Sequence, residues 1–483
     1  MMVKIQVVLI VVMILMFWQK LVFASENKNS STLTLSLKDA ISTALLNNQT
    51  ILNDAKNNLK LASRNLIAIH KLYQPKISLD ISSQRTTNET ELASTRQDKY
   101  STSLNSTWSK VIFTSGVLTL SEGYKLSEDK NSSQKFSTNP YVSIGLNQPL
   151  SEGGKLQQRL SLINADENLK LEKMKYALIE EQLMLNVISN YYQIIRANLL
   201  VKQAEEQVAL SKQLLKWTEA RLKVGQIAEL DVMNAKVQLA NDEDFLVQSY
   251  EQRQTLQRSF LRLLGLSEDL KLELSDEIEV KILNEKVEES INEAIENRLE
   301  IKMAKISIEQ SKRNIPIARS TNKPTLTISG NYSWTNESEE LEEAIKELPQ
   351  RNWLIQAKLS FPFFDSGSTK NQVKISEINY QKTLNAFEQL KKDIIEEITQ
   401  IHWNLNKNQR RLEVLEVNLK IAQDARRISQ LKYEMGLLTI REVLQSQITY
   451  SNVKISIDDA KIDYLINQAK LSKAIGKLKN EYL

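Results

Sequence analysis

The side chains that most often carry out covalent chemistry in proteins are scarce in this sequence. The chain contains no cysteine and only two histidines, His70 and His402, which excludes thiolate nucleophiles, thiolate metal sites and disulfide frameworks. Asp and Glu residues are scattered over helical patterns without an isolated carboxylate pair, and no glycine-rich phosphate loop occurs. The sequence therefore predicts a protein that is not an enzyme and needs no cofactor or metal. Each histidine is expected to pack or to reach solvent.

Two very long runs without glycine or proline, 155–224 and 368–435, dominate the chain. Each has about 70 residues and would be about 100 Å long as continuous helix. Apolar and small residues recur at spacings of three and four on two adjacent stripes, which suits a ring or sheet of helices. A two-stranded coiled coil, which needs one stripe, stays open. Gly225 and Gly436 end these runs, and shorter helices, 226–264 and 437–475, are expected to return from them.

Composition and the N-terminus bear on location. A formal charge of +4 over 483 residues gives no support for a nucleic-acid partner. The apolar stretch from Ile5 to Trp18 and the small residue Ala24 predict a signal peptide over residues 1–24. An uncleaved signal anchor is the alternative. The mature chain is therefore expected to be exported into a Gram-negative-type envelope.

The sequence is internally duplicated, which is its most specific feature. Prolines and glycines at the expected ends of helices and strands recur in the same order in the two halves. The equivalent pairs are Pro75 and Pro324, Pro149 and Pro362, Gly153 and Gly367, Gly225 and Gly436, Gly265 and Gly476. This order predicts a first repeat over 25–265, an acidic connector over 266–286 and a second repeat over 287–483.

Both repeats contain alternating apolar and polar residues between the first helix and the long one, at about 76–148 and 325–361. In the second repeat they form two segments of a length suited to bilayer-crossing strands of about 9 to 11 residues, joined by an acidic loop, 337–347. A half-buried soluble hairpin is the alternative. The first region is about twice as long, which leaves open an extra external hairpin near 117–126 or additional barrel strands.

Four strands cannot close a membrane barrel, and an open sheet edge cannot face lipid. Several copies are therefore expected to close one barrel in lipid, with helices from the same copies closing a tube. The assembly would be a water-filled duct. The rival hypothesis is an exported coiled-coil scaffold or adhesin without a pore.

The sequence resembles the TolC family of outer-membrane channel proteins over essentially the whole mature chain. The resemblance rests on the duplication and on two junction segments, LNQPLSEGG with Pro149 and Gly153, and LSFPFFDSG with Pro362 and Gly367. It also rests on two tip motifs, around Gly225 and around Gly436.

The resemblance implies a mainly helical fold with transmembrane β structure. It implies a homotrimer with a twelve-stranded barrel in the outer membrane and a twelve-helix tunnel extending into the periplasm. It further implies a tripartite efflux pump or type I secretion system. There, the duct passively conducts substrates delivered by a periplasmic adaptor (membrane fusion) protein and an inner-membrane transporter of the RND or ABC type.

The resemblance also assigns roles to residues at the tips. It implies that Arg221, Gly225, Asp231 and Gly436 belong to the surface that docks the adaptor. Tyr433 and Glu442 would lie at the pore entrance, where Tyr433 and Asp231 match positions of a latch and Glu442 matches an acidic ring. Leu438 stands where the latch arginine would be, and Gln445 where a second acidic residue would be. The closed entrance is therefore expected to be held differently in this chain.

Overall fold

The computed structural model describes residues 32–90, 95–129, 136–276, 278–283, 285–339 and 341–483. The chain divides into two compact units. One comprises residues 51–179 and 294–396, and the other comprises 180–293, 397–483 and the described residues up to Thr50. The predicted signal peptide, 1–24, lies outside the described residues.

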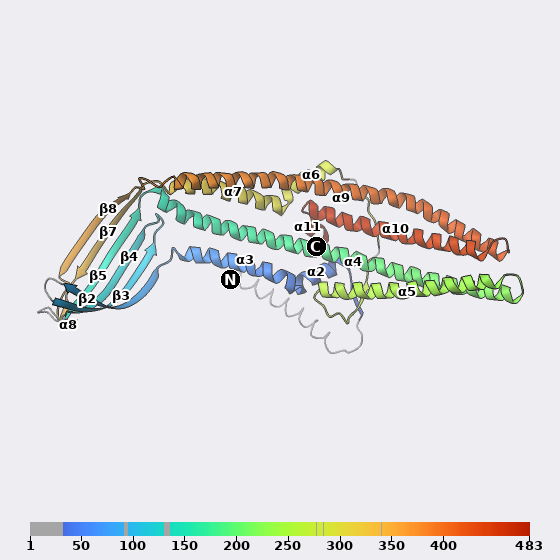
Figure 1. The fold of residues 1–483 in the computed structure, drawn as a ribbon, viewed down its shortest axis with the longest axis horizontal. Coiled ribbons are helices and arrows are strands. Elements are labelled where there is room, and N and C mark those ends of the chain that lie inside the picture. The colour runs from blue at the N-terminus through green and yellow to red at the C-terminus, as the bar shows by residue number, and fades with distance from the viewer. Residues whose placement is uncertain (1–31, 91–94, 130–135, 277, 284, 340) are drawn as a thin grey trace, which may run out of the picture. The chain divides into compact units, whose positions relative to one another are not determined.

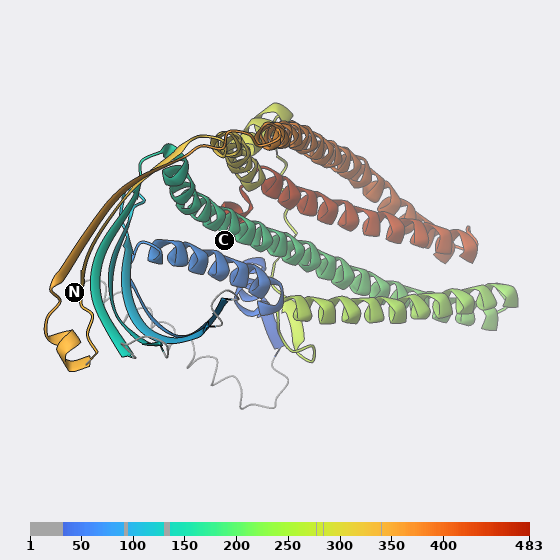
Figure 2. The same ribbon diagram turned by 60° about the vertical axis from the view of Figure 1, so that its left-hand side comes forward.

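The first unit contains one antiparallel sheet, visible as a curved layer in Figures 1 and 2. Its strands follow the order β2, β3, β4, β5, β7, β8, so the chain contributes six strands where the resemblance implied four. The predicted regions contain these strands, and the long first region holds four of them. The strands are β2 (Lys76–Thr90), β3 (Thr95–Val111), β4 (Val117–Asp129), β5 (Phe136–Pro149), β7 (Thr325–Thr335) and β8 (Gln350–Ser360).

The register of the sheet gives it one apolar and one polar face, because side chains alternate along each strand. Ile81 pairs with Leu104, which in turn pairs with Tyr124, so apolar residues meet across three strands. On the opposite face, small polar residues pair in the same way, and Ser82 and Ser103 lie 2.8 Å apart through their hydroxyl oxygens. A sheet with these two faces separates an apolar medium from water.

Helices α4 (Glu152–Lys223) and α9 (Ser368–Glu434) are the two long helices expected from the sequence. Glycine and proline are absent after their first turns, so nothing interrupts the backbone hydrogen bonds. The returning helices are α5 (Glu229–Leu263) and α10 (Ile440–Ala474), and both begin three residues later than predicted. Among the described residues, no helix combines the length and apolar character that crossing a membrane requires.

The helices that precede the sheet strands are broken, which the sequence did not reveal. The segment between Ser36 and Tyr73 forms two helices, α2 (Leu37–Asn47) and α3 (Gln49–Lys71). Asn48 lies at the break, and its side-chain amide donates to the carbonyl of Leu263 at 2.9 Å. The second repeat breaks at Arg298, between α6 (Val287–Asn297) and α7 (Leu299–Ser320). Ser36 and Asp39 form a capping box at the start of α2.

Four short elements complete the fold of the described residues. The connector contributes β6 (Lys271–Leu274), which pairs in parallel with β1 (Thr32–Leu35). The fully buried Tyr191 of α4 contacts this small sheet, because its hydroxyl donates to the Leu35 carbonyl of β1 at 3.2 Å and to Asp276 Oδ2, just after β6, at 2.9 Å. The acidic segment expected as a loop contains α8 (Leu341–Lys346), and α11 (Leu478–Tyr482) follows α10.

Candidate functional site

The two hairpin tips have the same backbone structure. Gly225 and Gly436 have φ angles of 73° and 74°, and a Cβ added to either would meet no atom within 4 Å. The amide of the following residue donates to a carbonyl five residues back, from Gln226 to Arg221 and from Leu437 to Lys432, at 2.9 Å in each case. This is the Schellman arrangement, which needs a left-handed residue. The glycines are therefore required by conformation, and the space around them is open.

Arg221, in the last turn of α4, contacts the end of α9. Its guanidinium carbon lies 4.6 Å from the centroid of the Tyr433 ring. Its Nη2 donates to the carbonyl oxygen of Glu434 at 2.6 Å. A guanidinium over an aromatic ring and a charge-assisted hydrogen bond are both stabilising. Arg221 therefore clamps the α9–α10 hairpin to the α4–α5 hairpin.

Tyr433 also belongs to the packed core beneath the tips. It is 3% exposed, and burial raises the pKa of its hydroxyl; the charge of Arg221 lowers this pKa and that of Asp231 raises it. The phenol is therefore neutral at physiological pH, and its ring is fixed between charged neighbours. The residues that pack with it are Leu214, Ile440, Val443 and Leu444, with Trp217 partly buried against them.

Glu442 lies apart from this clamp, on the first turn of α10. Its Oε2 accepts hydrogen bonds from the Thr439 amide at 2.8 Å and the Thr439 hydroxyl at 2.9 Å. Because hydrogen bonds to the charged form favour it, the backbone and side chain of Thr439 lower the pKa of Glu442. The exposed carboxylate is therefore ionised at neutral pH and caps its own helix.

The structure thus brings Arg221 and Tyr433 together, with Asp231 close enough to affect the tyrosine, and leaves Glu442 outside the contact. Leu438 has no charged group, and the guanidinium over the Tyr433 ring comes from Arg221 of the other hairpin. Sequence reasoning grouped Arg221 only with the docking surface. The available signal was that Arg221 and Lys432 occupy equivalent positions before the two glycines and differ in side chain.

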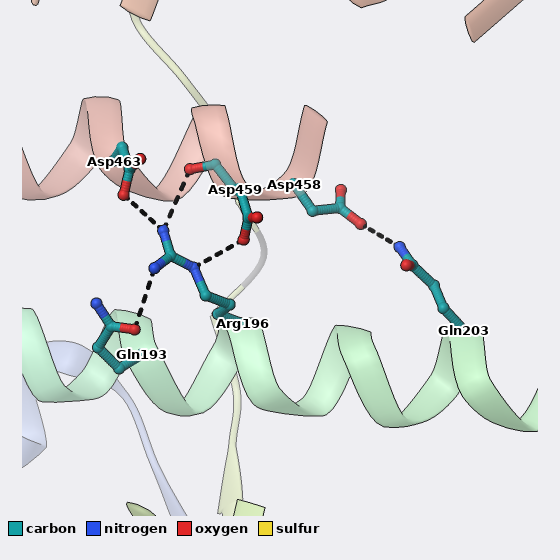
Figure 3. Close-up of polar contacts among 6 residues, drawn as sticks. All are labelled: Gln193, Arg196, Gln203, Asp458, Asp459 and Asp463. Carbon is teal, nitrogen blue, oxygen red and sulfur yellow. Dashed lines mark hydrogen bonds and ion pairs between the residues drawn. The ribbon is translucent and has the colours of Figure 1, made fainter. Parts of the chain in front are cut away.

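A second polar cluster joins α4 to α10, more than six turns before the tip (Figure 3). Arg196 pairs through Nε with Asp459 Oδ1 at 3.0 Å and through Nη2 with Asp463 Oδ1 at 2.6 Å. Its Nη1 donates to Gln193 Oε1 at 3.2 Å. One guanidinium therefore neutralises two carboxylates that project from successive turns of α10.

Asp458 lies beside this cluster, and its carboxylate is less well stabilised than those of Asp459 and Asp463, which pair with Arg196. It accepts a hydrogen bond from Gln203 Nε2 at 2.7 Å, and burial raises its pKa above the ordinary value. The other amide atom, Gln203 Oε1, is buried and has no hydrogen-bond partner among the described residues. The site thus holds a partly desolvated charge next to an acceptor that lacks a donor.

We expect Asp458→Asn to stabilise the protein by about 1 kcal/mol at neutral pH, because asparagine can accept from Gln203 Nε2 and also donate to Gln203 Oε1. A raised folded-state pKa means that the wild-type carboxylate costs stability as the pH rises through that pKa. The gain should therefore shrink at acidic pH, where Asp458 is itself protonated. Thermal unfolding of the wild type and of Asp458→Asn at several pH values measures this gain in stability. Asp459→Asn is the control and should destabilise, because it weakens the pair with Arg196.

The junction residues lie where strands meet long helices. Pro149 ends β5, and Gly153 lies in the first turn of α4. Pro362 and Gly367 lie between β8 and α9, and Gly367 has a φ of 81°. The carboxylate of Asp365 accepts from the amides of Gly367 and Thr369 at 3.0 and 2.9 Å, which caps α9.

The histidines have no arrangement suited to metal binding. His402 is 6% exposed, and its Nε2 lies 2.9 Å from the hydroxyl oxygen of Ser290. Burial lowers the pKa of His402. Over the ranges that the structure describes, no three His, Asp or Glu residues are grouped as metal ligands would be.

Comparison with known proteins gives consistent results. Residues 40–266 and 290–477 match the outer membrane efflux protein family. The chain is 26% identical over 378 residues to outer membrane protein TolC of Vibrio cholerae, covering 75% of this chain and 82% of that protein. It is 23% identical to TolC of Escherichia coli, covering 76% and 74%. Its fold is similar to that of CusC, with a TM-score of 0.71 at 18% identity, covering 94% of this chain and 95% of that one.

Proposed function

The chain belongs to the outer membrane efflux protein family, and from this premise we propose that it forms the duct of a tripartite efflux pump or type I secretion system. It is an outer-membrane channel protein with helices extending into the periplasm, and it is not an enzyme. The duct would conduct passively, with energy supplied by an inner-membrane transporter. The observation that carries this proposal is the sheet with one apolar and one polar face.

A homotrimer is the assembly we propose for this duct. Among the described strands, the outer strands β2 and β8 each have a neighbour on one side only. In lipid, the free backbone groups of such edges must be paired. Copies of the same chain can pair them in a closed ring, with the apolar face toward outer-membrane lipid and the polar face toward the lumen.

The hairpin tips are our proposed docking surface for a periplasmic adaptor protein, which would connect the duct to a transporter of the RND or ABC type. The surface would include Arg221, Gly225, Asp231 and Gly436. Support comes from large apolar side chains exposed at both tips, an arrangement that marks interaction surfaces. These are Val224 and Leu230 on one tip and Met435 and Leu437 on the other.

Tyr433 and Glu442 are our proposed entrance residues. Tyr433, held by Arg221, would keep the α9–α10 hairpin in the closed position. Three copies of Glu442 near one axis would attract cations and repel anions. The low pKa of Glu442 supports this role, because the carboxylate keeps its charge.

Single-channel recording of the detergent-extracted protein in planar bilayers tests the proposed function. A duct predicts discrete openings from protein that requires detergent for solubility. Protein that stays soluble without detergent and gives no conductance would instead support the exported scaffold or adhesin.

We expect Glu442→Gln to reduce the preference for cations while leaving openings of similar size. Glutamine can still accept from Thr439 in a capping box, so the helix start should persist and the change should act mainly through charge. Reversal potentials in a salt gradient measure the preference. Glu434→Gln, a charge change on the neighbouring helix end, is the control. Unchanged selectivity in Glu442→Gln would remove Glu442 from the pore.

A further inference from the structure

The two edges of the sheet have complementary directions. Strands alternate in direction through the sheet, beginning with β2 and ending with β8. An even number of strands therefore leaves the two edges antiparallel to each other. A β8 edge can consequently pair with the β2 edge of a second copy in the same antiparallel manner as the pairs within one chain.

The internal duplication shows how that pairing would be made. Strand β5 is the last sheet strand of the first repeat, and it pairs with β7, the first sheet strand of the second repeat. By the equivalences of Pro149 with Pro362 and of Pro75 with Pro324, β8 corresponds to β5 and β2 corresponds to β7. The contact between β5 and β7 is therefore an internal copy of the contact expected between β8 and the next chain's β2.

This correspondence fixes a register. Gln356 corresponds to Ser143, whose partner Ser333 corresponds to Gln84. Gln356 should therefore lie opposite Gln84 of the next copy. By the same steps, Leu359 should lie opposite Ile81 of the next copy.

The faces of the sheet provide an independent check. Leu359 and Ile81 both lie on the apolar face, and they are 68% and 71% exposed in the single chain. A slip of one residue would place each of them opposite a residue of the polar face, because the side-chain period is two. The register taken from the duplication thus also joins the two faces correctly.

The β3–β4 hairpin has the same two faces as its neighbours. Trp108 pairs with Leu120, which pairs with Ile144 of β5, so the apolar face continues through it. On the polar face, the Tyr141 hydroxyl donates to Asn105 Oδ1 at 2.9 Å. A solvated external hairpin would not need an apolar face in register with that of the barrel strands.

We propose that β8 of each copy pairs with β2 of the next with Gln356 opposite Gln84, so that three copies of six strands close a barrel of eighteen. The proposal rests on the proposed function for its three copies. Barrel diameter grows roughly linearly with strand number, so this barrel would be about one and a half times as wide as one of twelve strands. Barrels of about this size leave an aqueous channel.

Cysteine cross-linking tests the register, and the chain offers a background without cysteine. We expect Gln84→Cys with Gln356→Cys to give covalent dimers and trimers on oxidation, because opposed residues have a Cβ spacing that suits a disulfide. The matched control is Asp80→Cys with Gln356→Cys. Its cysteines lie on the same face but would be offset by about 13 Å, and it should stay monomeric in a non-reducing denaturing gel.

Three results would overturn parts of the proposal separately. Equal linking in both double variants would refute the register. Trimers in native mass measurements without linking of the matched pair would refute the β2–β8 contact while leaving the duct. Absence of any oligomer would contradict the proposed function itself.

Thiol labelling in outer-membrane vesicles tests whether the extra hairpin lies in the barrel. We expect Ser121→Cys, on the polar face of β4, to react with a membrane-impermeant maleimide at least tenfold faster than Leu120→Cys, on the apolar face. Equal, fast labelling of both positions would place the β3–β4 hairpin outside the membrane barrel and would refute the count of eighteen.

Discussion

Replacing Arg221 with alanine should open the channel. The substitution removes the guanidinium from the Tyr433 ring and the hydrogen bond to the Glu434 carbonyl. At a partly exposed site these contacts are worth about 1 kcal/mol per chain in the closed state. If three chains open together, the ratio of closed to open channels falls by about a hundredfold.

Single-channel recording in planar bilayers measures this effect as a higher open probability. Lys223→Ala is the matched control, since Lys223 lies on the same last turn of α4, carries the same charge and is exposed. Arg221→Lys should give an intermediate value, because lysine keeps the charge but lacks the planar fork. An Arg221→Ala channel that stays closed as often as wild type would show that the clamp does not control the entrance.

The parts of the fold that sequence reasoning found are those with strong local signals. Long runs without glycine or proline predicted α4 and α9, and glycines at matched places predicted the hairpins after them. Alternation predicted β7 and β8, which each have 11 residues. The duplication strengthened each of these predictions, because every element had a counterpart.

The parts that it missed depend on contacts between distant residues. Strands β3 and β4 are rich in serine and threonine, so their apolar face emerges only when the register aligns Trp108 with Leu120. The break at Asn48 interrupts a continuous helical pattern, and the amide that stabilises it reaches Leu263, which lies 215 residues away in the sequence. Sheet β1–β6 joins a four-residue strand at the start of the first repeat to a four-residue strand in the connector.

The candidate site divides in the same way. The turn glycines could be identified from sequence, because their positive φ is a local requirement. The partner of Tyr433 could not, because the expected arginine position holds Leu438 and the guanidinium comes from a residue 212 positions earlier, Arg221. In the structure, the arginine that contacts Tyr433 is therefore Arg221 on the α4–α5 hairpin and not a residue at position 438.

The second large effect concerns Arg196, because α4 and α10 are also held together there. Arg196→Ala would leave Asp459 and Asp463 as two like charges one turn apart on α10. Removing one partner of a fully buried ion pair costs about 3 to 5 kcal/mol. The Arg196, Asp459 and Asp463 side chains are 27%, 37% and 42% exposed, so solvent screening reduces the expected loss to about 2 kcal/mol.

Chemical denaturation measures this loss, and Lys212→Ala is its control. Lys212 pairs with Glu243 at 3.0 Å between α4 and α5, but both side chains are at least half exposed, so its removal should cost no more than about 0.5 kcal/mol.

Arg196 and Arg221 lie 25 residues apart on α4, about 37 Å along the helix, so their effects on unfolding should add. Their effects on gating should differ. Arg196→Ala should weaken the attachment of α10 far from the tip, whereas the Tyr433 clamp should stay in place and, in its proposed role, keep the entrance closed. A rise in open probability in Arg196→Ala as large as that in Arg221→Ala would contradict this division and would place the hinge of the hairpin farther from the tip than the Arg196 cluster.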